Sequence, residues 1–315
     1  MTVNPVREVE HEITVRAAAS DVFRLIAEVE NWPNVFPPSV YVDHVERTGD
    51  RERIRIWATA NGEAKSWTSR RELDRTALRI TFAQEVSSPP VSMMSGTWIA
   101  EPLDDGSTRL RLLHTYRAVD DDPAGLEWID KAVDRNSRSE LASLKASIES
   151  ITEHAELTHS FVDSVLVDGA AADMYDFVNE AHLWTERLPH VAAVKLTEDT
   201  PGLQVLRMDT LTKDGSSHTT ESVRVCFPRH KIAYKQTTLP ALMSLHTGYW
   251  LFEEGADGVT TASSQHTVRI NEANIAKILG PAAGVDEARA FIREVLGTNS
   301  RATLDQAKRY AEARR

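Results

Sequence analysis

The sequence of 315 residues repeats itself once, with the two copies about half a chain length apart. Short groups of residues in the first half return at one constant spacing in the second. They are Ser20-Asp21-Val22-Phe23 with Ala172-Asp173-Met174-Tyr175, Trp32 with Trp184, Gly96-Thr97-Trp98 with Gly248-Tyr249-Trp250, and His114-Thr115 with His266-Thr267. A repeat of this length is a whole domain, because a solenoid unit has only about 20–50 residues. The sequence therefore predicts two tandem domains of one fold, 1–154 and 155–315.

Each half carries the pattern of a short helix, several strands and a long final helix. In the first half, 10–15 alternates like a strand, 22–29 has helical spacing that ends at Trp32-Pro33, and strand-like segments follow from 40 to 119. Asn61-Gly62 and Asp105-Gly106 are typical of hairpins between antiparallel strands. An apolar stripe then predicts a helix over 123–153, and the second half repeats the order to a final helix near 285–313.

This order of elements predicts an α+β fold of two tandem helix-grip domains. In each domain a curved antiparallel sheet would wrap around the long C-terminal helix, because only that helix is large enough to cover the concave face. We expect an internal cavity between the sheet and the helix.

Composition narrows the possible partners and chemistry. The net charge of −11 argues against nucleic acid or an anionic membrane as partner. The single cysteine, Cys226, and an N-terminal segment unlike a signal peptide indicate a cytoplasmic protein. The sequence has no glycine-rich phosphate loop and no metal-ligand motif, so we expect no cofactor and no metal. Any chemistry would be acid–base chemistry performed by the cavity itself.

Strand alternation assigns side chains to the cavity. Around 110–117, arginines occupy one face, so His114 points inward with leucines and a tyrosine. By the same rule Trp67, Ser69 and Arg71 point inward from an earlier strand. His114 is either a core histidine or a functional group. Arg71 is either part of an internal ion pair, with Asp134 or Glu85, or a fixed cation for a ligand oxygen.

Aromatic side chains accompany these polar groups. Met94 and Trp98 share one strand face, with Gly96 leaving room between them, and Trp32 lies near the same mouth. A purely structural core would favour Val, Ile and Leu. Apolar walls with a few convergent polar groups are typical of a small-molecule pocket.

Three segments of the first half carry a family resemblance: Glu30-Asn31-Trp32-Pro33-Asn34-Val35-Phe36, Trp67-Thr68-Ser69-Arg70-Arg71 and Asp134-Arg135-Asn136-Ser137-Arg138. On these the chain resembles the two-domain aromatase/cyclases of bacterial type II polyketide synthases, which serve antibiotic biosynthesis. The resemblance implies an enzyme that takes a poly-β-ketone from an acyl carrier protein. It would direct the first aldol ring closure, of the C7–C12 type, and an aromatising dehydration, beside other subunits of the synthase.

The resemblance also implies roles for residues. Arg71 would polarise a ketone or enolate oxygen, His114 would transfer protons at a pKa near neutrality, and Asp134 would orient His114. The substrate-binding wall would consist of Trp32, Phe36, Trp67, Ser69, Met94 and Trp98.

The second half is expected to keep a pocket but to lose the cation. Its pocket residues would be Trp184, His218, Thr220, Trp250 and His266. The alignment sets His218, Thr220 and Ser222 against Trp67, Ser69 and Arg71, so no arginine is expected there. We therefore expect the first domain to carry the primary chemistry.

Two other functions fit a helix-grip fold. One is a non-catalytic carrier of a hydrophobic or polyketide ligand, since this fold is widely used for binding alone. The other is a structural subunit whose cavities are packed shut. The inward arginine and histidine favour the enzyme, because a carrier would more often have an all-apolar lining.

Overall fold

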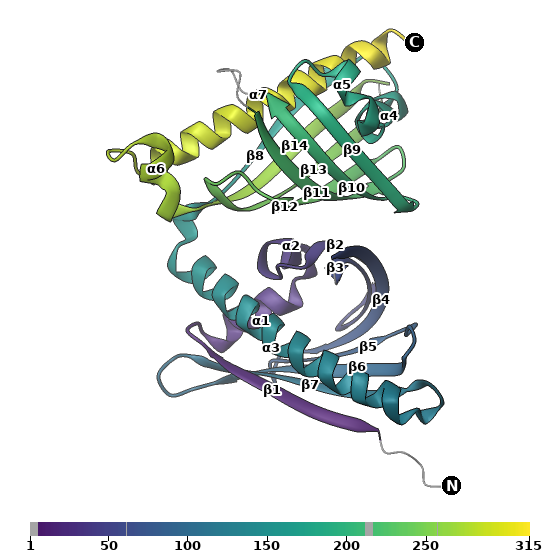
Figure 1. Cartoon of the computed structure of the whole chain (residues 1–315), viewed down its shortest axis with the longest axis vertical. Helices are drawn as coiled ribbons and strands as arrows, with labels where there is room; N and C mark the ends of the chain where they lie inside the picture. Colours follow the sequence, from purple (N-terminus) through teal and green to yellow (C-terminus); the bar gives the residue numbers. More distant parts are fainter. Residues whose placement is uncertain (1–5, 61, 212–216, 257) are drawn as a thin grey trace. The chain divides into compact units, whose positions relative to one another are not determined.

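The chain folds into two compact units, one ending at Ala155 and the other running from Glu156 to Arg315. The computed structural model describes residues 6–60, 62–211, 217–256 and 258–315. Both units show the same plan in Figure 1, a strongly curved sheet with one long helix running along it.

The first domain contains one antiparallel sheet in the strand order β1-β7-β6-β5-β4-β3-β2. Its strands are β1 (Arg7–Val15), β2 (Ser39–Thr48), β3 (Arg51–Ala60), β4 (Glu63–Asp74), β5 (Arg79–Gln84), β6 (Val91–Pro102) and β7 (Thr108–Ala118). Its helices are α1 (Ala19–Ala27), α2 (Trp32–Val35) and the long α3 (Pro123–Glu153), with 3-10 turns at Val29–Asn31 and Val119–Asp121. A further 3-10 turn, Ala155–Leu157, spans the point in the chain where the first unit ends and the second begins.

The second domain repeats this topology, with the strand order β8-β14-β13-β12-β11-β10-β9. Its strands are β8 (Thr158–Val167), β9 (Val191–Thr200), β10 (Leu203–Leu211), β11 (Ser217–Phe227), β12 (Lys231–Thr238), β13 (Met243–Glu254) and β14 (Thr260–Ile270). Its helices are α4 (Ala171–Asn179), α5 (Trp184–Arg187), the additional α6 (Ile275–Leu279) and the long α7 (Val285–Glu312), with 3-10 turns at Ala181–Leu183 and Glu272–Asn274. The predicted pair of helix-grip domains is thereby confirmed.

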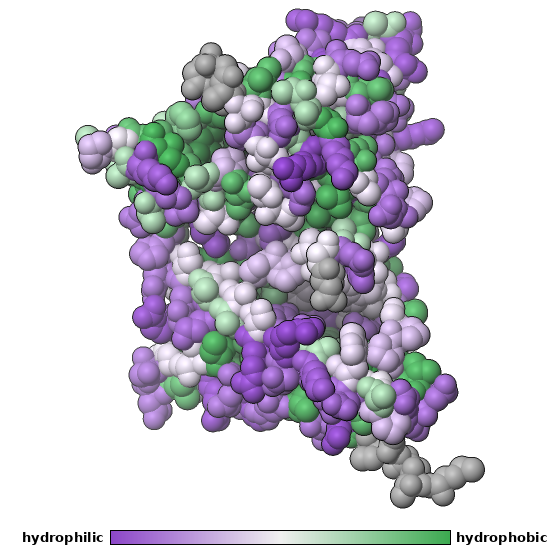
Figure 2. Space-filling view, in the orientation of Figure 1, coloured by the Kyte–Doolittle hydropathy of each residue, from purple (hydrophilic) through white to green (hydrophobic). Residues whose placement is uncertain are grey.

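Helix α3 begins where the local sequence favours a helix start. The Asp122 side chain accepts hydrogen bonds from the backbone N–H groups of Ala124 and Gly125, and Pro123 occupies the first turn, where its missing N–H is not needed. Most outward-facing positions of the helix are polar, although Trp128 is 56% exposed. The viewed faces of both domains carry mainly hydrophilic side chains with scattered apolar ones (Figure 2).

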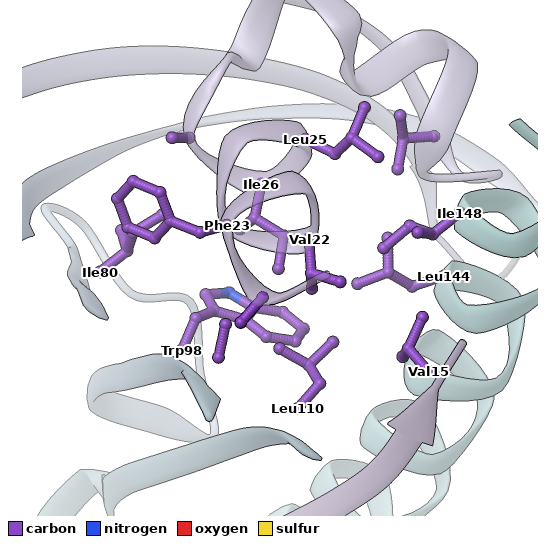
Figure 3. Packing of buried hydrophobic residues seen from close by; sticks show 14 of the residues in the cluster. Val15, Val22, Phe23, Leu25, Ile26, Ile80, Trp98, Leu110, Leu144 and Ile148 are labelled. Carbon is purple, nitrogen blue, oxygen red and sulfur yellow. The ribbon is translucent and has the colours of Figure 1, made fainter. Parts of the chain in front are cut away.

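The position of α3 decides where the cavity can form. Its C-terminal half buries Leu141, Leu144 and Ile148 in a core shared with α1 and the sheet, part of which is shown in Figure 3. Its N-terminal half buries Ile129 and Val133 in a separate cluster around Tyr116 and Ala118. Between these two apolar clusters, the side of the helix that faces the sheet carries polar side chains. The cavity lies between the helix and the sheet along this part of the helix.

The predicted helix break at Trp32-Pro33 is wrong in detail. Helix α1 already ends at Ala27, and Trp32 begins the short helix α2 instead of closing the previous one. Proline is compatible with this start, because the first helical turn leaves its N–H groups unpaired in any case. The indole Nε1 of Trp32 donates to the carbonyl oxygen of Ile26 at 2.9 Å. This bond ties the α2 start back to the end of α1.

None of the described helices combines the length and the apolar character needed to cross a bilayer.

Candidate functional site

The first domain encloses a cavity of about 230 Å³ between the concave face of the sheet, helix α2 and helix α3. Eight of the nine residues predicted for this site line it: Trp32, Phe36, Trp67, Ser69, Arg71, Met94, Trp98 and His114. Phe82, Gln84, Leu112 and Glu140 line it as well. Alternation along the strands therefore identified most of the wall.

Arg71 is a buried cation held from several sides. Its side chain is 2% exposed, and Nη1 lies 2.8 Å from Oε1 of Glu52 on the neighbouring strand β3. Nη2 donates to the carbonyl oxygen of Ile26 at 2.9 Å, and the guanidinium lies 5.0 Å from the ring centre of Trp32. Burial lowers the pKa of Arg71 to about 10, so the group stays protonated at neutral pH.

The ion pair corrects the partners expected from the sequence. Neither Asp134 nor Glu85 pairs with Arg71: Glu85 binds Arg53 and Arg70. The Glu52 carboxylate makes Arg71 electrically balanced, while the guanidinium still lines the cavity. Arg71 therefore combines the features of both interpretations: it forms an internal ion pair, and its guanidinium still faces the cavity.

Aromatic rings form the wall beside Arg71. The ring centres of Trp32 and Phe36 are 4.9 Å apart, and those of Phe36 and Trp98 are 6.3 Å apart. Trp98 also packs in the core below the cavity, where Figure 3 shows it against the α1 side chains. Trp67 and Met94 extend the wall along strands β4 and β6. These rings give the cavity flat, rigid surfaces for a conjugated ligand.

His114 lies on the inner face of β7 and is neutral. Its Nδ1 lies 3.5 Å from Oγ of Ser137 on helix α3, and its ring stands edge-on to Phe82 at 5.8 Å. Burial lowers the pKa of His114 to about 4. The expected pKa near neutrality is therefore wrong, because the cavity withdraws the imidazole from water. A neutral imidazole accepts a proton or donates a hydrogen bond, but it does not act as a cationic acid.

The predicted role of Asp134 is also wrong. Its carboxylate lies on the exposed side of α3, where Oδ1 lies 3.0 Å from Nε2 of His11 and accepts a hydrogen bond from Nε of Arg138 at 2.9 Å. The helix presents Ser137 to His114 instead. The misplacement of Asp134 is explained by helix geometry. Asp134 follows the buried Val133 directly, and each residue of an α-helix is rotated about 100° from the one before it, so Asp134 points away from the cavity.

Glu140 is the acidic group that the helix places in the cavity. It lines the first cavity together with His114, and desolvation by burial raises its pKa to about 7. A heptad-like stripe could have located it, because Val133, Ser137, Glu140 and Leu144 follow each other at helical spacings of four, three and four. Ser137 and Glu140 are polar residues in an otherwise apolar stripe, and this pattern could have identified them from the sequence as cavity residues.

The second domain encloses a smaller cavity of about 130 Å³. All five residues predicted for it line the cavity: Trp184, His218, Thr220, Trp250 and His266. The predicted loss of the cation is wrong, because Arg224 lines the cavity too. Strand pairing shows the equivalence, since Arg71 lies opposite Glu52 and Phe82, while Arg224 lies opposite Gln204 and Tyr234.

The sequence alignment missed Arg224 because the loop between the two paired strands differs in length between the domains. Thr59 pairs with Ala64 across the β3–β4 hairpin, and Leu211 pairs with Ser217 across the β10–β11 hairpin. The second connection is one residue longer, so each residue of β11 corresponds to its first-domain counterpart one position later than in the rest of the repeat. The alignment expected from the sequence had placed the β11 residues one position earlier instead. Thr220, Ser222 and Arg224 therefore correspond to Trp67, Ser69 and Arg71.

The second cavity contains a hydrogen-bonded cluster of histidines and hydroxyl groups. Nδ1 of His266 lies 2.9 Å from the Tyr234 hydroxyl and 2.9 Å from Nε2 of His246. Nε2 of His266 lies 2.6 Å from Oγ of Ser300 on helix α7. Burial lowers the pKa of His266 to about 4. A helix serine thus contacts the histidine in both domains, but Ser300 meets Nε2 of His266 whereas Ser137 lies near Nδ1 of His114. Tyr234 and His246 replace the apolar Phe82 and Met94.

Comparisons with known proteins agree with this geometry. The family described as polyketide cyclase/dehydrase and lipid transport matches residues 6–149 and again 158–312. The granaticin polyketide synthase bifunctional cyclase/dehydratase of Streptomyces virginiae is 51% identical over 298 residues, covering 94% of this chain and 97% of the relative. The actinorhodin polyketide synthase bifunctional cyclase/dehydratase of Streptomyces coelicolor is 43% identical over 309 residues, covering 95% of each.

Solved structures of two-domain proteins match nearly the whole chain. The di-domain ARO/CYC BexL, from the BE-7585A biosynthetic pathway, has 67% sequence identity and a TM-score of 0.93, covering 97% of this chain and 99% of its own. The di-domain ARO/CYC StfQ, from the steffimycin pathway, has 36% identity and a TM-score of 0.88, with the same coverage.

The environment of His114 predicts its titration. Because burial holds its pKa near 4, we expect His114 to remain neutral as the pH falls through 6.5, the ordinary value, and to gain a proton only near pH 4. Nitrogen chemical shifts of the imidazole, followed by NMR in a pH series and assigned with His114→Asn, measure this. A midpoint near 6.5 would show that water solvates the imidazole and would remove the argument for a neutral group.

Proposed function

The chain belongs to the polyketide cyclase/dehydrase and lipid transport family, in its two-domain aromatase/cyclase form, and on this basis we propose that its first cavity closes and aromatises the first ring of a poly-β-ketone. One observation carries the proposal. A single cavity brings a buried guanidinium (Arg71), a neutral imidazole (His114) and a carboxyl group with a pKa near 7 (Glu140) together between aromatic walls.

Ring closure needs a base, a place for negative charge and a returned proton. A methylene carbon between two ketones loses a proton to the Glu140 carboxylate or to His114, and the enolate oxygen lies toward Arg71. The enolate carbon then forms a bond to a second ketone carbon, whose oxygen takes the proton back and becomes a hydroxyl group. The guanidinium stays paired with Glu52, so it favours the neutral ketone at rest and stabilises the negative charge that develops on the oxygen during the reaction through its fixed N–H groups.

Dehydration uses the same groups a second time. A proton leaves the carbon next to the new hydroxyl-bearing carbon, the C–O bond breaks, and the proton joins the departing oxygen as water. Ionised Glu140 suits the removal of the proton, and the neutral acid that results suits its return. Aromatisation of the ring makes this step favourable. The sequence of steps consumes no oxidant, reductant or metal.

The shape of the wall supports a preference for one ring pattern. Trp32, Phe36 and Trp98 form adjoining surfaces, and Arg71 fixes one carbonyl oxygen against them. A chain held at one oxygen and bent along rigid rings presents only certain carbons to each other. We assign the C7–C12 closure to this arrangement, with the chain delivered by an acyl carrier protein and with other synthase subunits as partners.

A non-catalytic carrier is the alternative function. A carrier of hydrophobic ligands gains little from a buried ion pair and an acid of raised pKa, because both are costly to desolvate. The presence of Arg71, His114 and Glu140 in one lining favours the enzyme.

A reconstituted synthase tests the enzyme directly. We expect the purified protein, added to a minimal type II polyketide synthase without ketoreductase, to shift the products from spontaneously cyclised shunts to one ring pattern. Chromatography and mass spectrometry of the products measure the shift. An unchanged profile without ketoreductase, and again after its addition, would contradict catalysis and favour the carrier.

Variants of the ion pair separate the structural role of Arg71 from its chemical role. Arg71→Met leaves the buried Glu52 without its nearest cation, and we expect a loss of about 3–5 kcal/mol in unfolding free energy, typical of a broken buried pair. Adding Glu52→Gln should recover much of the stability in urea unfolding, while directed cyclisation stays lost in both variants. Normal products from the double variant would show that Arg71 serves the fold alone.

Glu140 predicts the pH dependence of the reaction. Its carboxylate form increases as the pH rises through about 7, so we expect the rate of directed cyclisation to rise across the same range. Glu140→Gln should lower the rate about 100-fold or more, as expected for loss of a general base, and abolish this dependence. Ser139→Ala, at an exposed position of the same helix, is the matched control. A pH profile unchanged in Glu140→Gln would assign the titration to another group.

A further inference from the structure

The two cavities differ in the charge that surrounds an equivalent arginine. Arg224 repeats the contacts of Arg71: Nη2 donates to the carbonyl oxygen of Val178 at 2.6 Å, and the guanidinium lies 5.4 Å from the ring centre of Trp184. The opposite strand, however, supplies Glu52 in the first domain and Gln204 in the second. A neutral amide therefore stands where the first domain has a carboxylate.

The surroundings of Arg224 do not restore the missing negative charge. Gln204 is 2% exposed, and its Nε2 donates to Glu198 at 2.8 Å. Within the described ranges, Nη1 of Arg224 and Oε1 of Gln204 have no hydrogen-bond partner. Glu198 is the acidic residue whose charge acts on Arg224, but it is exposed to solvent and bound to the Gln204 amide.

Other groups near Arg224 are neutral at physiological pH. Burial raises the pKa of the Cys226 thiol to about 11 and also raises the pKa of the Tyr175 phenol. Burial lowers the pKa of Arg224, but an arginine guanidinium remains protonated in proteins. The second cavity thus carries one net positive charge that the first cavity has neutralised.

The rest of the second cavity suits a ring system with oxygen substituents. Trp184 and Trp250 supply aromatic walls. In the same cavity as Arg224, the cluster of Tyr234, His246, His266 and Ser300 offers hydroxyl and imidazole groups at hydrogen-bonding distances from one another. These groups can donate to neutral ligand oxygens, whereas the guanidinium favours a charged one.

We propose that the C-terminal cavity is a binding site for an oxyanion on a conjugated ring, such as a carboxylate, phenolate or enolate, with the charged oxygen directed to Arg224. The first cavity, whose cation is already paired, favours neutral ketones. Cyclised polyketides carry acidic enols and phenols, so such a site would retain a ring after closure. Binding of an oxyanion here requires no catalysis in the first cavity and can be tested in its absence.

Two probes of equal size test the site in the purified full chain: 2-naphthoate and 2-acetylnaphthalene, which share a ring system and differ in charge. We expect isothermal titration calorimetry to show one naphthoate per chain, bound at least about tenfold more tightly than the ketone, as expected for a charge-assisted contact. 2-Naphthol, titrated below and above its own ionisation, distinguishes a phenolate site from one that accepts carboxylates only.

Reciprocal substitutions locate the effect. Gln204→Glu gives Arg224 the partner that Arg71 has, and we expect naphthoate binding to weaken about tenfold or more with ketone binding unchanged. Glu52→Gln removes the carboxylate that neutralises Arg71, and we expect a second naphthoate site to appear. Thermal unfolding of each variant verifies the fold.

Either of two results would overturn the assignment: equal affinity of the wild-type protein for naphthoate and ketone, or naphthoate affinity unchanged in a folded Gln204→Glu. The comparison of probes needs no variant, so it decides even where a substitution unfolds the domain. Loss of cyclisation in a reconstituted synthase would leave the binding result intact, which keeps failure of the proposed enzyme distinct from failure of this site.

Discussion

Each domain depends on one long helix covering the concave face of a curved sheet. In the first domain α3 does this with two apolar clusters, one around Leu141, Leu144 and Ile148 and the other around Ile129 and Val133. Because these clusters hold the helix at both ends, the interval between them cannot close onto the sheet. Ser137 and Glu140 fall in that interval, and the cavity with its chemistry lies there. The same packing that stabilises the fold therefore creates the site.

The buried arginine connects the fold with the chemistry. Arg71 binds the carbonyl oxygen of Ile26 near the end of α1, lies against the ring of Trp32 at the start of α2 and pairs with Glu52 on β3. It thus joins the helical segment to the sheet at the edge of the cavity. A charge fixed by so many contacts needs little reorganisation when a substrate oxygen becomes negative, which is the property that electrostatic catalysis requires.

Duplication allowed the two cavities to diverge while the scaffold stayed the same. The arginine, the aromatic residue at the helix start, the histidine and the helix serine recur in both domains. What changes is the charge opposite the arginine and the polarity around the histidine, where Tyr234 and His246 replace Phe82 and Met94. These differences change the charge and polarity of each cavity without altering the strand order, because they lie on the inward faces of strands that pair in the same order in both domains.

The sequence by itself determined the duplication, the α+β order, the bounds of the long helix over 123–153 and the inward faces of the strands, because these depend on local periodicity and composition. Alternation alone placed Arg71 and His114 in one cavity. Tertiary structure decided which helix residues face them, since packing of Leu141, Leu144 and Ile148 sets the rotation of α3 and selects Glu140 over Asp134. It also decided the register of β11, where one extra residue in a connection restores Arg224, and the pKa values of His114 and Glu140, which follow from burial.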